Sequence, residues 1–164
     1  MSIKNYLKNI SGWRTKRKLV IFSVDDYGNV RLASKCAFEN LKDRNIPFNS
    51  HFDRLDTLET RTDLEKLFRV LSSVKDQHGK SAVFTAYALS CNIDFETMAE
   101  NGFEEYSYEL VPTTYEKLAL KDSNAYEGTW DLWKEGIDQG LLKPQFHGKE
   151  HFNLNIFKNL LYRR

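Results

Sequence analysis

Two adjacent carboxylates, Asp25 and Asp26, are the first residues whose type and spacing could support chemistry. They follow a short apolar run at residues 19–22 and precede Gly28, a typical turn residue. A continuous apolar run of this length predicts a strand that is buried on both faces of a parallel sheet. Active sites of α/β proteins form at the carboxyl ends of such strands. Because neighbouring side chains on an extended chain point apart, one aspartate could face a metal and the other a substrate or structural partner.

A second candidate group is the pair His147 and His151. If this segment is helical, the spacing of four residues places both imidazoles on one face, where they can share a metal ion. Taken alone, a His-x-x-x-His sequence is also compatible with a solvated surface segment. The pair follows a strand predicted at 141–146, and the carboxyl ends of parallel strands lie at the same edge of a sheet. We therefore predict a three-ligand set of one aspartate and two histidines with open positions, as in catalytic metal centres.

The spacing of apolar residues predicts alternating strands and helices, which is typical of an α/β fold with a mostly parallel sheet and right-handed crossovers. Thr62 and Glu65 have the spacing of a helix capping box, Thr129 and Asn153 are predicted helix caps, and Gly140 is a predicted helix stop. Helices are predicted at 33–41, 62–74, 129–139 and 153–161, with a weaker one in 1–17. Strands are predicted at 82–87 and 141–146, with weaker ones at 48–52 and 106–110. Helical turns are predicted at 94–99 and 114–118. Pro112 is expected to interrupt the chain before the second of these turns.

Composition limits the classes of function. The 164 residues carry a net charge of +1, which gives no electrostatic reason to expect binding to nucleic acid or to a membrane surface. No segment is apolar enough for a membrane span or a secretory signal. The two cysteines, Cys36 and Cys91, have no disulfide spacing and are expected to be buried thiols in a reducing compartment. We therefore expect a cytoplasmic protein with a single domain covering residues 1–164.

With both motifs in view, the sequence resembles the polysaccharide deacetylase family. The first motif of that family, Thr-Phe-Asp-Asp-Gly, is matched by Ser23-Val24-Asp25-Asp26-Tyr27, and its second, His-Ser/Thr-x-x-His, by residues 147–151. The Asp-Asp-Tyr-Gly order is also similar to a related group of sugar deacetylases with Asp-Asp-Phe-Gly, but that group lacks the His-x-x-x-His motif. Gly28 comes one position later than in the family, and Gly148 replaces its Ser or Thr.

The resemblance implies a role for each matched residue. Asp25 would be the catalytic base, while Asp26, His147 and His151 would bind a divalent metal, with zinc as the leading choice. The implied fold is the N-terminal portion of a distorted (β/α) barrel, with mostly parallel strands inside and helices outside. The implied activity is removal of acetyl groups from a sugar or polysaccharide, so the expected substrate is a carbohydrate.

The family's later motifs, which supply an arginine that orients the base and a histidine that acts as general acid, have no counterpart after His151. We therefore expect a domain truncated at its C-terminus that self-associates or pairs with a missing C-terminal half. A half barrel would leave strand edges and an apolar interior uncovered. A different metal-dependent hydrolase with the same ligands remains open, as does a non-catalytic relic or interaction module that keeps the fold and the metal site.

Several other residues are weighed as weaker candidates. His51 could reach the same sheet edge or lie on a surface loop, while His78 is expected to be structural. Glu150 and Lys149 are expected to be solvated charges. Arg31 and Arg54 could bind a sugar or phosphate or orient Asp25, although each could equally be a surface ion-pair partner.

Overall fold

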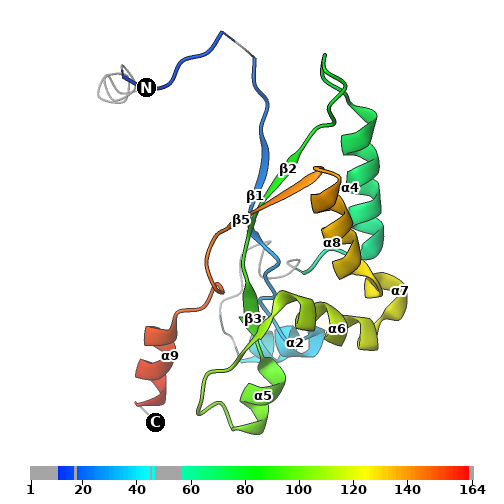
Figure 1. Ribbon diagram of the computed structural model, residues 1–164. Coiled ribbons are helices and arrows are strands. Elements are labelled where there is room, and N and C mark those ends of the chain that lie inside the picture. Colours follow the sequence, from blue (N-terminus) through cyan, green and yellow to red (C-terminus); the bar gives the residue numbers. More distant parts are fainter. Residues whose placement is uncertain (1–10, 17, 45, 47–56, 163–164) are drawn as a thin grey trace.

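A parallel three-stranded sheet organises the computed structural model, which describes residues 11–16, 18–44, 46 and 57–162 (Figure 1). Its strands are β1 (Phe22–Tyr27), β2 (Phe84–Ala88) and β5 (Leu142–Phe146), in the order β1-β2-β5. All pairings are parallel, so the three carboxyl ends lie at one edge. The α/β class with a mostly parallel sheet is therefore confirmed.

Two helices cover one face of this sheet, as Figure 1 shows. They are α4 (Arg61–Ser73) and α8 (Thr129–Asp138), whose apolar faces bury Leu64, Leu71 and Trp133. Between them Gly136 lies so close to the Phe68 ring that a Cβ there would come within 2.2 Å of a ring carbon. The two helices pack closely because position 136 carries no side chain. The core that results contains Leu58, Leu64, Ala86, Val111, Tyr115, Trp133 and Leu142.

The remaining elements surround the carboxyl edge of the sheet. A two-stranded antiparallel ribbon, β3 with β4, follows β2. Helix α6 begins with Pro112 in its first turn, where a missing backbone N–H costs nothing, so this proline opens a helix instead of interrupting the chain. The bounds are α2 (Lys35–Asp43), β3 (Cys91–Ile93), α5 (Phe95–Glu100), β4 (Tyr108–Leu110), α6 (Val111–Lys121), α7 (Ser123–Tyr126) and α9 (Leu154–Leu161).

The prediction that the apolar run at 19–22 is a strand buried on both faces is wrong. Val20 and Ile21 are 79% and 77% exposed, and β1 begins only at Phe22. In the described part of the chain, β1 lies at one edge of the sheet, and helix α8 packs against β5 at the other edge. A continuous apolar run indicates a strand but does not say how many layers cover it.

Several helix boundaries also differ from the prediction. Helix α4 begins after Thr60, whose hydroxyl accepts from the Asp63 backbone N–H while the Asp63 carboxylate accepts from the Thr60 backbone N–H. The capping box is therefore Thr60–Asp63 and not Thr62–Glu65, because Asp63 serves the same purpose as a Glu two residues earlier in the chain. Helix α8 begins after Gly128, which has φ +71°, and Thr129 lies inside the helix.

Other expected boundaries are confirmed. Gly140, with φ +69°, follows the end of α8, and the Asn153 side chain accepts from the Ile156 backbone N–H at 3.0 Å to begin α9. The predicted strand at 48–52, most of the predicted helix in 1–17, and His51 and Arg54 lie outside the described residues. Cys91 is buried as expected, but Cys36 is exposed. Among the described helices, none combines the length and apolarity needed to cross a membrane.

Candidate metal centre

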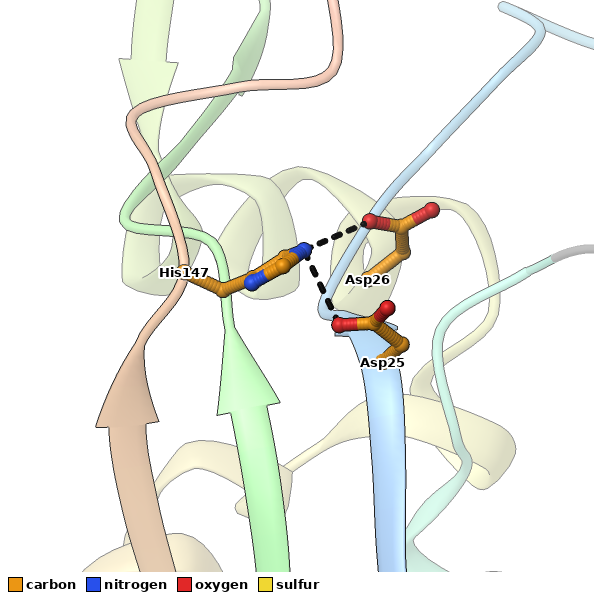
Figure 2. A group of neighbouring side chains, drawn as sticks. All are labelled: Asp25, Asp26 and His147. Atoms are coloured by element: carbon orange, nitrogen blue, oxygen red, sulfur yellow. Dashed lines mark ion pairs between the residues drawn. The ribbon is translucent and has the colours of Figure 1, made fainter. Parts of the chain in front are cut away.

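The structure brings the two predicted motifs together at the carboxyl edge of the sheet. His147 directly follows β5, and its Nε2 atom lies 2.9 Å from Asp25 Oδ1 and 3.4 Å from Asp26 Oδ1 (Figure 2). His151 Nε2 lies 3.4 Å from the other oxygen of the same aspartate, Asp26 Oδ2. Asp26 therefore lies between the two histidines and presents one carboxylate oxygen to each.

Both aspartates face His147, although adjacent residues of a regular strand point to opposite faces. The register between β1 and β2 shifts between Val24 and Tyr27, so the strand is bulged at the two aspartates. Asp26 also has φ +53°, a left-handed conformation that Asp tolerates better than most residues. These two irregularities turn the Asp26 carboxylate toward the imidazole that Asp25 contacts.

The segment from His147 to His151 is not helical. It continues from β5 in extended form and is held by three backbone hydrogen bonds: His147 N–H donates to Ala88 C=O at 2.9 Å, Ser90 N–H to Gly148 C=O at 3.3 Å, and Cys91 N–H to Lys149 C=O at 2.8 Å. Gly148 has φ +135°, which favours glycine at this position. Both imidazoles therefore reach Asp26 from a loop and not from one helix face.

Aromatic rings hold the far end of this loop. The rings of Tyr106 and Phe152 are stacked with centroids 5.5 Å apart, and Phe152 also contacts Phe157 of α9 at 5.4 Å. The Lys149 ammonium lies 3.3 Å from the centre of the Tyr108 ring. Since His151 precedes Phe152, the stacked rings restrict where its imidazole can lie.

A buried asparagine holds the segment that follows the aspartates. Asn92 in β3 is 2% exposed; its Oδ1 accepts from the Val30 backbone N–H at 2.8 Å, and its Nδ2 donates to the Gly28 carbonyl at 3.0 Å. The next residue along, Arg31, places a guanidinium nitrogen 3.7 Å from Asp26 Oδ2. Asp26 thus faces groups that carry or can carry positive charge on more than one side.

The donor set fits a transition metal. Ligand atoms that bind zinc tetrahedrally at about 2.0–2.2 Å are separated by roughly 3.3–3.5 Å. The two contacts of Asp26 with histidine nitrogens, both 3.4 Å, match that separation, whereas the 2.9 Å contact of Asp25 is a hydrogen-bond distance. Asp25, Asp26 and His147 form a compact group with ligand atoms within 4.8 Å of one another, and His151 is not a member of it. His151 would therefore have to move closer to join His147 at one ion.

One carboxylate near this site was missed by the sequence analysis. Glu59, which precedes α4, lines a hollow that Asp25 and Asp26 also line. Its Oε1 accepts from the Tyr115 hydroxyl at 2.7 Å and from the Trp133 indole nitrogen. Burial raises the pKa of Glu59 above its usual value, although the hydrogen bonds from Tyr115 and Trp133 oppose this effect. No spacing pattern marks Glu59, because its partners come from α6 and α8, far away in the sequence.

The same environment affects Tyr27, the residue after Asp26. Burial, together with the nearby Glu59 charge, raises the pKa of Tyr27, and the pKa of Tyr115 is raised for the same reasons. The Tyr27 ring packs 5.3 Å from Trp133 and 5.6 Å from Phe84. The carboxyl end of β1 is therefore anchored in the aromatic core directly beside the candidate metal centre.

The weaker candidates lie apart from the centre or differ from expectation. His78 is remote, and its imidazole contacts the neighbouring Gln77 side chain at 3.1 Å. Glu150 is not a solvated charge, because its side chain is only 7% exposed.

No protein-family model, curated protein or solved structure matches this chain.

Proposed function

We propose that the chain is a metal-dependent hydrolase of the carbohydrate deacetylase type. Asp26, His147 and His151 hold a divalent cation, with zinc as the leading choice, and Asp25 is the general base. The observation that carries the proposal is that the two oxygens of Asp26 each face a different histidine nitrogen at 3.4 Å. The parallel strands β1, β2 and β5 are proposed as part of a distorted (β/α) barrel, because α4 and α8, the helices that cover them in the described residues, lie on one face.

A bound divalent cation would acidify water and polarise a substrate carbonyl. The roles of the protein's own groups follow from their positions. Asp25 is 71% exposed at its side chain, so it can accept a proton from water that attacks an acetyl carbonyl.

The open face of the sheet offers space for a substrate beside these groups. Ser23, Asp25, Tyr87 and His147 line a hollow of about 340 Å³, which falls within the roughly 300–1,000 Å³ typical of ligand sites. The edge of the Tyr87 ring lies against His147, with centroids 6.1 Å apart. An acetylated sugar bound there would meet the base, Asp25, and one proposed metal ligand, His147.

One observation favours a second candidate, a binding module without catalysis. His147 Nε2 is closer to Asp25 than to Asp26. If that contact persists, a protonated His147 would occupy the base and would not coordinate a metal. In this case the cluster is an ion-pair network that fixes the sheet edge.

Metal analysis separates the two candidates. Protein purified with zinc and dialysed should retain zinc in the wild type and lose it in Asp26→Ala, His147→Ala and His151→Ala, whereas His78→Ala, a matched histidine variant remote from the site, should retain it. Acetate release from acetylated chito-oligosaccharides should follow the zinc content. A wild-type protein without zinc, or equal zinc content in all variants, would remove the metal centre and favour the binding module. Zinc binding without acetate release would count against the deacetylase activity alone.

A further inference from the structure

The two edges of the parallel sheet differ in how they are protected. In the described part of the chain, the sheet ends with β1 on one side and with β5 on the other. Strand β5 carries Lys143 and Pro144, and native proteins use both residue types to keep an edge strand from pairing with another chain. Strand β1 has neither type, and its charged residues and its bulge come only after Val24. The β1 edge is therefore open to pairing, whereas the β5 edge is protected.

An exposed apolar run begins before β1 and continues into it. Its members are between 42% and 79% exposed: Leu19, Val20, Ile21, Phe22 and Val24. The pairing of β1 with β2 begins only at Phe22, and Figure 1 shows the preceding residues continuing from β1 as an extended chain. An exposed apolar strand at the edge of a sheet is a template on which another strand can pair. This edge of the sheet therefore has the properties of an interface.

The charges that flank the apolar run indicate which strand would pair there. Lys18 precedes the run, and the segment Asp25–Asp26 follows it. If two copies pair antiparallel with Phe22 opposite Phe22, Val20 lies opposite Val24, and Lys18 of each copy meets the Asp25–Asp26 end of the other. A shift of two residues in one direction places Lys18 opposite Val24, and in the other it places the acidic end opposite Val20. Because opposite charges and apolar pairs both stabilise paired strands, the segment is complementary to itself in this one register.

We propose that residues 18–26 form a two-fold interface with a second copy of this chain, in which the two β1 strands pair antiparallel about Phe22. The two sheets then join into one continuous sheet with three strands from each copy. Such a contact uses the same surface on both copies, so it closes at two subunits. Lys143 and Pro144 at the β5 edge keep the joined sheet from growing further. The interface does not depend on the proposed function.

The first test is the oligomeric state, measured by light scattering over a series of protein concentrations. The wild type should be a dimer that dissociates on dilution. Phe22→Lys should weaken the dimer about tenfold or more, since an apolar pair is lost and like charges directly opposite each other repel. Leu120→Lys, a matched variant at an 89% exposed residue of α6, should dimerise as the wild type does. A wild type that stays monomeric at every concentration, or a folded Phe22→Lys protein that dimerises as tightly as the wild type, would overturn the proposal.

The second test is a cross-link that reports the register, and it decides if circular dichroism shows that Phe22→Lys does not fold. It uses a Cys36→Ser background, which removes an exposed native thiol. Phe22→Cys should form a covalent dimer on oxidation, because residues directly opposite each other on antiparallel strands have Cα atoms about 4.5–5.5 Å apart, within the range of disulfides. Leu120→Cys should remain monomeric on a non-reducing gel. No covalent dimer of Phe22→Cys, or equal amounts from both variants, would overturn the proposal.

Discussion

Asp26 and Glu59 line the same hollow, but opposite kinds of partner hold the two carboxylates. Asp26 faces two imidazoles and a guanidinium, groups that carry or can carry positive charge. Glu59 faces neutral donors, the Tyr115 hydroxyl and the Trp133 indole nitrogen. A carboxylate whose partners are basic side chains can bind a metal cation in their place. A carboxylate that accepts hydrogen bonds from neutral donors in the core is held in one position. From this comparison we infer that the aspartates are the candidates for metal binding and catalysis, and that Glu59 stabilises the core.

The largest effect that would test this division is on catalysis. Asp25→Asn should lower acetate release by roughly 10²–10⁴-fold, because the amide cannot accept a proton from water. Its zinc content should match that of the wild type, since Asp26 and the histidines remain. Asp131→Asn, at an exposed carboxylate of α8, is the control and should leave both quantities unchanged. Loss of zinc in Asp25→Asn would mean that Asp25 is a ligand and not the base.

The next largest effect is on stability. Glu59→Ala should lower the free energy of unfolding in urea by about 3 kcal/mol, because it leaves the Tyr115 and Trp133 donors unsatisfied in the core. Glu65→Ala, which removes an exposed ion pair with Arg61, should cost less than about 1 kcal/mol. If the two variants were equally stable, Glu59 would not be an anchor.

The pH dependence of the unfolding free energy should provide a further test of the role of Glu59. Because the folded-state pKa of Glu59 is raised above 4.5, its contribution to stability is fully present below that pH and is lost as the pH rises through the folded-state pKa. Glu59→Gln cannot titrate and should lack this loss. The difference in unfolding free energy between wild type and Glu59→Gln should therefore change with pH over that range. Parallel stability curves would contradict this expectation.

The smallest effect concerns Asp63, a fourth carboxylate of the hollow. Hydrogen bonds from Thr60 lower its pKa below 3.8, so its contribution is present above that pH and is lost as the pH falls. Thr60→Ala should cost about 1 kcal/mol as a lost helix cap and should raise the Asp63 pKa in an NMR titration. An unchanged Asp63 pKa would show that the capping box does not govern this carboxylate.

Local patterns were sufficient to predict much of the sheet and its helices. The apolar period of α4, the Asn153 cap of α9 and the Gly140 stop of α8 all follow from short-range physical chemistry. The meeting of the Asp25–Asp26 and His147–His151 segments was predicted because parallel strands share a carboxyl edge. The roles of these residues as base and ligands stay predictions.

Features that depend on long-range partners could not be predicted in this way. Glu59 gains its role from Tyr115 and Trp133, and Asn92 from Gly28 and Val30, with no pattern in the intervening sequence. The bulge at Asp26 likewise depends on pairing with β2 and not on its neighbours. The burial of Glu150 was missed because a charged loop residue is usually solvated.

Gly136, which has no side chain, lies between the packed helices α4 and α8 and is hydrogen-bonded to the residue before β5, the strand that leads to the candidate metal centre. The Gly136 carbonyl accepts from the Leu141 backbone N–H at 2.9 Å, and β5 runs from there to His147. A methyl group at 136 would collide with the Phe68 ring, so that ring or helix α8 would have to shift. Any shift of α8 that this collision causes would act, through the hydrogen bond to Leu141, on the strand that leads to His147 at its other end.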